Sequence, residues 1–236
     1  MGSTRLPQKS MLPLAGKPLV GRILERVKMA KSIDEIVLAI PKTKNDDVLL
    51  KLSEEYEVAC FRGSENDLVD RYYRAAQAHG AELVLRLPAD NVCSEAREFD
   101  KLIDAHLIDG NDFSSNICNF MGNGYPDGIG VEVFTFESLA YIWRSERDMH
   151  KREHVALNYY DYLNDSLPKN PKFKVGTIQC RTDYARPDIT LDVNTEDDYR
   201  LMADLYADLQ SGEEPFEFRD VINWWDCKFS EENYRG

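Results

Sequence analysis

The opening of the chain has the residue types and spacing of an anion-binding loop. The segment "MGSTRLPQKS" contains Gly2 and Ser3, followed by Arg5 and Lys9. Backbone N–H groups of small residues can surround phosphate oxygens, while an arginine adds a planar fork and a lysine adds a point charge. The segment lacks the Gly-Lys-Ser/Thr of a Walker A loop. We therefore expect a polyphosphate-binding loop of another kind.

Two aspartates further along the chain are candidate ligands for a divalent cation. Asp90 follows a predicted strand and lies in the segment "RLPADN". Asp192 comes directly after "ITL" and lies in the segment "TLDVNT". A lone aspartate after a strand is usually a helix cap. Magnesium, however, is commonly held by one or two carboxylates together with the phosphates of a substrate. A cationic loop combined with two such aspartates favours a Mg²⁺ site at Asp90 and Asp192.

Helical and strand patterns alternate along the chain, which is typical of an α/β fold. Helical periodicity predicts helices at 18–31, 45–56, 65–80, 95–109, 136–145, 152–163 and 196–210. Short apolar runs predict strands at 34–40, 57–61, 81–90, 112–117 and 131–134, with a β-rich stretch at 173–191. This order predicts a mainly parallel sheet flanked by helices, whose ligand site lies at the carboxyl ends of the strands.

The composition narrows the class of protein. The chain has 236 residues, 30% of them charged, and a net charge of −13, which argues against general binding to nucleic-acid phosphates. No apolar run approaches the ~18 residues of a membrane span. Five scattered cysteines without a C-x-x-C pair are typical of a reduced, cytoplasmic protein. We expect a cytoplasmic protein with no nucleic-acid or membrane partner.

The charge is unevenly distributed. Residues 1–31 carry seven Lys or Arg and a single acid, which gives +6 and leaves −19 for the remainder. This asymmetry agrees with a local anion site. The ordinary alternative is a solvated basic helix face that carries Arg22, Arg26 and Lys28.

Several motifs, taken together and in order, resemble a known family. The opening "GSTRLPQKSMLPLAGKPLVGRILERVK" looks like the start of the cytidylyltransferases that make CMP-activated sugar acids, and most closely the branch of spore coat polysaccharide biosynthesis protein F. The later matching motifs are "GSENDLVDRYYRAA" (63–76), "RLPADN" (86–91), "YPDGIGVEVF" (125–134), "REHV" (152–155) and "TLDVNTEDDY" (190–199).

The resemblance implies a fold, an activity and a set of site residues. The fold would be a Rossmann-like nucleotidyltransferase of the nucleotide-diphospho-sugar transferase type. It would form one domain over 1–236, with 118–190 contributing an acceptor or dimerisation region. The activity would be Mg²⁺-dependent transfer of CMP from CTP to a sugar acid for surface polysaccharide synthesis, with release of pyrophosphate. Arg5, Lys9 and Asp90 would be catalytic, the loop with Gly2 and Ser3 would bind CTP, and Asp90 and Asp192 would hold the metal. A homodimer is expected.

Some positions depart from the family pattern. Gln8 stands where glycine is usual, Val92 where proline is usual, and Gly130 where aspartate is frequent. In the family the opening loop also follows a first β-strand in the middle of the sheet, and we expect such a strand to belong before Met1.

Two other functions fit parts of the sequence. One is a non-catalytic relative that binds a nucleotide without turnover, which Gln8 favours and the intact charged residues oppose. The other is a zinc hydrolase, because "HKREH" matches H-x-x-E-H and places His150, Glu153 and His154 at ligand spacing. A five-residue pattern arises easily by chance, and a charged helix start accounts for it as well.

Overall fold

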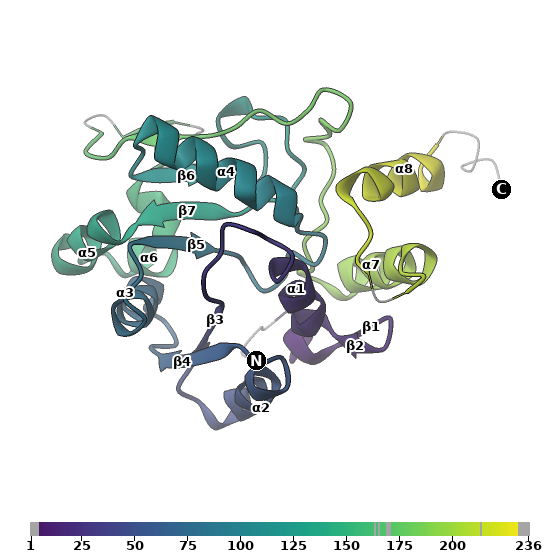
Figure 1. Ribbon diagram of the computed structural model, residues 1–236, viewed down its shortest axis with the longest axis horizontal. Helices are drawn as coiled ribbons and strands as arrows, with labels where there is room; N and C mark the ends of the chain where they lie inside the picture. The colour runs from purple at the N-terminus through teal and green to yellow at the C-terminus, as the bar shows by residue number, and fades with distance from the viewer. Residues whose placement is uncertain (1–4, 163, 165, 169–170, 213, 231–236) are drawn as a thin grey trace.

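Helices and strands alternate along the chain (Figure 1). The computed structural model describes residues 5–162, 164, 166–168, 171–212 and 214–230. The helices are α1 (Leu19–Val27), α2 (Asp47–Glu55), α3 (Leu68–Ala78), α4 (Ala96–Asp109), α5 (Phe136–Ser145), α6 (Met149–Glu153), α7 (Glu196–Leu209) and α8 (Phe218–Lys228). The strands are β1 (Pro13–Leu14), β2 (Lys17–Pro18), β3 (Val37–Pro41), β4 (Ala59–Gly63), β5 (Leu83–Arg86), β6 (Phe113–Ser115), β7 (Glu132–Thr135) and β8 (Val175–Gly176).

The main sheet has the strand order β5-β7-β6-β8. Strands β5 and β6 both pair antiparallel with β7, and β8 pairs parallel with β6. Three of these strands therefore share one direction, and β7 alone is reversed. A second sheet contains β3 and β4 in parallel, and β1 and β2 form a small hairpin. The predicted α/β fold with parallel strands is confirmed. The order of helices and strands along the sequence did not predict that β7 runs antiparallel to its neighbours.

The β3-β4 sheet and the main sheet are not hydrogen-bonded to each other within the described residues. There, β3 pairs on one side only, with β4, and β5 pairs on one side only, with β7. Both strands are only partly buried although they are apolar. The strand expected ahead of the opening loop stays a prediction.

Helices cover both faces of the main sheet. Successive β-strand side chains point to opposite faces, and β7 shows this directly. Val133 packs with α1, α4 and α7 in one core cluster, whereas Phe134 packs with α3 and α5 in another. The amphipathic helices predicted from the sequence thus bury their apolar sides against two faces of one sheet.

Helix α1 is anchored by buried arginines. Arg22 and Arg26 are only 5% and 3% exposed, so the alternative of a solvated basic face is wrong for these two residues. Arg26 donates to the carbonyls of Ser94 and Phe216 at 3.2 and 3.1 Å. Because buried guanidinium groups must satisfy their donors, these contacts fix α1 against the segment that follows Asp90.

Two sequence predictions of local structure were wrong or incomplete, and one helix was not predicted. The helix expected at 152–163 is instead the short α6, which ends at Glu153. His154 follows in a non-helical conformation and precedes a 3-10 turn at Val155–Asn158. The β-rich stretch at 173–191 contributes only β8 and an isolated bridge at Thr190. Helix α8 was not predicted, and its apolar residues pack into the same core cluster as α7.

Candidate active site

The opening loop is fixed by contacts with distant segments. Lys9 begins a 3-10 turn that ends at Met11. Its Nζ donates to Asp90 Oδ2 at 2.7 Å and to the carbonyl of Val193 at 2.8 Å. Arg5, which is exposed, donates from Nη2 to Asn194 Oδ1 at 2.9 Å. The cationic loop, the end of β5 and the 190–195 segment therefore meet, as their expected positions at strand ends required.

The departure at Gln8 does not prevent the loop from turning. Gln8 has φ 58° and ψ 21°, which lies in the left-handed region that glycine adopts most easily. This conformation costs about 1 kcal/mol for a residue with a side chain. The turn that glycine would provide is thus retained at Gln8. Gly2 and Ser3 lie outside the residues that the structure describes.

Asp90 lies at the meeting point because the backbone around it is held on two sides. The N–H of Val193 donates to the carbonyl of Asp90 at 3.1 Å. The hydroxyl of Tyr206 donates to the carbonyl of Val92 at 2.7 Å, and Val92 is fully buried. The residue that replaces the usual proline is therefore a core residue. These contacts fix the backbone that carries the Asp90 carboxylate.

Asp192 carries the clearest sign of an unmet interaction. Its Oδ1 atom is buried and has no hydrogen-bond partner, while Oδ2 accepts from the side chain of Asn194. Burial, and then the neighbouring charges of Asp127 and Asp90, raise the pKa of the Asp192 carboxyl from its ordinary value of 3.8 to about 6. A buried carboxylate oxygen without a partner is costly, and a cation would remove that cost.

Asp127 is a third carboxylate of the site, and it was not singled out in the sequence. Its N–H donates to Ile189 and its carbonyl accepts from Leu191, both at 3.0 Å, so it is bridged to the strand-like segment before Asp192. Burial raises the pKa of Asp127, and the charge of Asp90 raises it further, while the Cys118 thiol donates to the carboxylate. The Asp-Gly pair in "YPDGIG" predicts a turn, but it does not indicate that this turn packs beside Asp192.

Two glycines permit this close approach. Gly128 has φ +90°, and a Cβ there would lie 2.7 Å from Leu191 C and 2.8 Å from Asp192 N. At Gly130 a Cβ would lie 2.2 Å from the carbonyl oxygen of Asn116. The aspartate that is frequent at this position in the resembled family therefore has no room here, and the nearby carboxylate is that of Asp127.

The carboxylates fit a divalent cation that is completed by a substrate. Within the described residues, no group of three or more His, Cys, Asp or Glu side chains is arranged to hold a metal ion. Hard oxygen donors are nevertheless present, and one of them, Asp192 Oδ1, is unpartnered. This arrangement suits Mg²⁺, which is usually bound by one or two carboxylates plus phosphate oxygens and water.

The zinc-hydrolase pattern does not form a metal site. The His150 and His154 rings contact each other edge to face, with centroids 4.8 Å apart, but these histidines and Glu153 do not make a metal-binding group in the described part of the chain. Arg152, which lies between them in sequence, turns inward and binds Asp67 at 2.7 Å. The pattern is therefore part of a short charged helix. No helix that the structure describes is long and apolar enough to cross a membrane.

Comparison with known proteins agrees with this geometry. A family model described as cytidylyltransferase matches residues 1–230. An uncharacterised protein of Methanocaldococcus jannaschii is 31% identical over 86% of this chain and 79% of its own length. Spore coat polysaccharide biosynthesis protein SpsF of Bacillus subtilis is 29% identical over 91% of this chain and 85% of its own.

Solved structures show the same fold. A cytidylyltransferase from Leptospira borgpetersenii has a TM-score of 0.85 and 26% identity, covering 97% of this chain and 91% of its own. A CMP:2-keto-3-deoxy-manno-octonic acid synthetase in complex with CTP has a TM-score of 0.61 and 13% identity, covering 88% and 95%. A family match over nearly the whole chain, together with a charged site at the strand ends, leads to one conclusion: the chain belongs to the cytidylyltransferase family.

Proposed function

We propose that this chain transfers the cytidylyl group of CTP to a hydroxyl of a sugar acid and releases pyrophosphate. Membership of the family gives the reaction class. Two observations support the assignment of residues. Lys9 Nζ lies 2.7 Å from Asp90 Oδ2, and Asp192, whose Oδ1 has no hydrogen-bond partner, lies beside them. A triphosphate bound by the opening loop would therefore lie next to both carboxylates.

The opening loop would bind and orient the triphosphate. Arg5 can form paired hydrogen bonds with phosphate oxygens, and Lys9 can donate to them as a compact positive charge. The N–H groups of Gly2 and Ser3 are proposed to add backbone donors. Because phosphoryl transfer needs little covalent help from the protein, positioning and charge neutralisation supply most of the rate.

Asp90 and Asp192 would hold Mg²⁺ against the triphosphate. When bound, the ion would offset charge on the phosphate oxygens and make pyrophosphate a better leaving group. The acceptor hydroxyl would lose its proton to solvent as its oxygen bonds to the α-phosphorus, and the bond from the α-phosphorus to the oxygen that bridges to the β-phosphate would break. Lys9 and Arg5 would stabilise the negative charge that develops on the departing pyrophosphate.

The acceptor class and the setting are also part of the proposal. The name of the Bacillus subtilis relative refers to polysaccharide synthesis, and the name of the synthetase solved with CTP refers to a sugar acid. We propose a sugar-acid acceptor used for surface polysaccharide or glycan synthesis in the cytoplasm. The 1–236 chain would act as one domain, with 118–190 at the acceptor or in a homodimer contact.

Pyrophosphate release with purified protein tests the proposal. Each of CTP, UTP, ATP and GTP would be supplied with Mg²⁺ and a panel of sugar acids, and the nucleotide product would be identified by mass spectrometry. We expect CMP-sugar to form with CTP, and Asp90→Asn to lose turnover while Asp104→Asn, an exposed carboxylate on α4, retains it. Tight CTP binding without pyrophosphate release for any acceptor would instead indicate the non-catalytic relative.

A further inference from the structure

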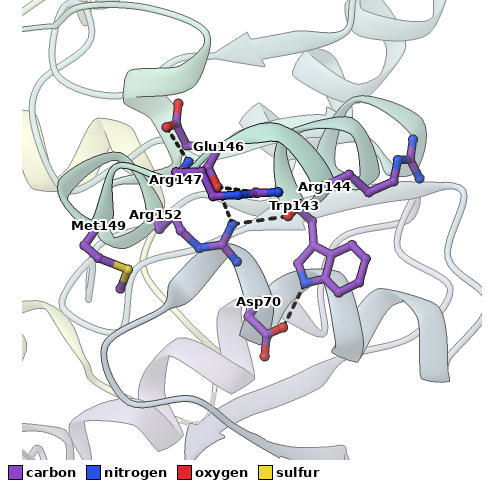
Figure 2. A pocket seen from close by; sticks show the side chains of 7 residues that line it. All are labelled: Asp70, Trp143, Arg144, Glu146, Arg147, Met149 and Arg152. Carbon is purple, nitrogen blue, oxygen red and sulfur yellow. Dashed lines mark hydrogen bonds between the residues drawn. The ribbon is translucent and has the colours of Figure 1, made fainter.

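A second charged cavity lies between helices α3, α5 and α6 (Figure 2). Its volume is about 530 Å³, and its lining includes Arg144, Arg147 and Arg152 together with Trp143 and Met149. None of these residues belongs to the candidate active site. A concentration of arginines is unexpected on a chain whose net charge is −13, and it suggests that the cavity binds a ligand of negative charge.

Arg152 is a fixed donor at the base of this cavity. Its residue is only 9% exposed, and Nε donates to Asp67 at 2.7 Å. Nη1 donates to the carbonyls of Trp143 and Glu146 at 3.2 and 3.0 Å. Figure 2 shows the remaining terminal nitrogen directed toward the space beside Asp70. Since three hydrogen bonds hold the guanidinium in place, little side-chain entropy is lost when a ligand binds to it.

The two carboxylates of the cavity are already engaged. Asp70 accepts from Arg74 Nε at 2.8 and 3.0 Å and from Trp143 Nε1 at 2.8 Å. Glu146 Oε1 accepts from two consecutive backbone N–H groups, the first of them that of Arg147, at 2.7 and 2.8 Å. The lining nevertheless keeps three arginines against these two acids, a formal excess of one positive charge.

Arg144 and Arg147 supply positive charge that is not paired. Both side chains are exposed, and in the described part of the chain neither forms an ion pair with a carboxylate, while Arg147 Nη1 donates to the carbonyl of Glu146 at 3.0 Å. Figure 2 shows Arg147 extending across Arg152, with Arg144 on the far side of Trp143. Met149 is 54% exposed and offers an apolar edge for the organic part of a ligand.

We infer that this cavity is a binding site for an oxyanion group, either a phosphate or a carboxylate, separate from the opening loop. Arginine forks match the geometry of both groups and bind them through charge-assisted hydrogen bonds. The fixed Arg152 at the base and the exposed Arg147 above it would hold such a group from two sides. A phosphate ligand here goes beyond the proposed function, whereas a carboxylate ligand rests on it, because these residues lie within 118–190, which is proposed to contact the acceptor or form a homodimer contact.

Calorimetric titration of the nucleotide-free protein tests the inference. Inorganic phosphate and 2-keto-3-deoxy-manno-octonate serve as separate probes at low ionic strength, which tells a phosphate ligand from a carboxylate ligand. We expect at least one probe to bind, and Arg147→Ala to weaken its binding by about tenfold because one charge-assisted hydrogen bond is lost. Arg144→Ala combined with Arg147→Ala should weaken it further.

Two control variants show whether the probe binds in this cavity or elsewhere on the protein. Arg97 is an exposed arginine of α4 paired with Glu217, and Arg97→Ala should leave the binding of the probe unchanged. Arg147→Ala should also weaken the binding by the same factor in a Lys9→Ala background, in which phosphate binding at the opening loop is reduced. If neither probe binds, if Arg147→Ala binds as the parent does, or if Lys9→Ala rather than Arg147→Ala abolishes binding, the inference is wrong.

Discussion

The strongest prediction concerns Asp192, whose replacement should stabilise the protein while removing a ligand of the proposed metal site. Asp192→Asn keeps the shape of the side chain but removes a charge that is partly buried near Asp127 and Asp90. The pKa of Asp192, raised from an ordinary 3.8 to about 6, means that folding disfavours the charged carboxylate by roughly 3 kcal/mol of free energy. Solvent screening of this partly exposed carboxylate reduces the figure to about 1–2 kcal/mol.

The effect should depend on pH with a defined sign. The native protein binds the Asp192 proton more tightly than the unfolded chain does, because the folded-state pKa is raised. The parent therefore loses stability from this group as pH rises from about 4 to about 6, and the loss is complete above that range. Asp192→Asn should gain about 2–8 °C in melting temperature at pH 8, and little at pH 4.

Thermal unfolding in EDTA measures this difference. The parent, Asp192→Asn and the exposed control Asp104→Asn would be compared at both pH values, and Mg²⁺-dependent turnover would be measured at pH 8. We expect Asp192→Asn alone to be stabilised at pH 8 and to lose turnover. An Asp192→Asn protein that melts at or below the parent at pH 8, or gains equally at both pH values, would refute the reasoning.

Three further outcomes are expected. Lys9→Ala should weaken binding of a triphosphate by about tenfold or more, measured by titration with CTP, since one charge-assisted contact is lost; unchanged affinity would assign Lys9 to structure. Gly130→Ala should lower the free energy of unfolding by about 1–3 kcal/mol in denaturant titrations, because its Cβ would collide with the Asn116 carbonyl oxygen at 2.2 Å, and an unaffected midpoint would show that the loop can move. Replacing both His150 and His154 with Ala should not change the zinc content of purified protein, measured by atomic absorption; a loss of stoichiometric zinc would restore the hydrolase alternative.

The sequence was sufficient for the parts of the site that follow local rules. Alternating apolar patterns predicted an α/β fold, because the 3.6-residue and two-residue periods are set by backbone geometry. Asp90 and Asp192 could be chosen because their positions at predicted strand ends place them at one edge of a sheet, and Lys9 because it belongs to a cationic loop.

Other features were decided only by tertiary structure. The charge pattern could not distinguish a solvated helix face from buried Arg22 and Arg26, because burial depends on which segments pack against α1. Asp127 joins the site only because Gly128 lets its loop press against the segment before Asp192. Such contacts join residues far apart in the chain, so no local period or spacing encodes them. The sequence by itself thus determined the elements and the charged groups at their ends, whereas the packing of distant segments determined which charges share a site and leave one Asp192 oxygen without a partner.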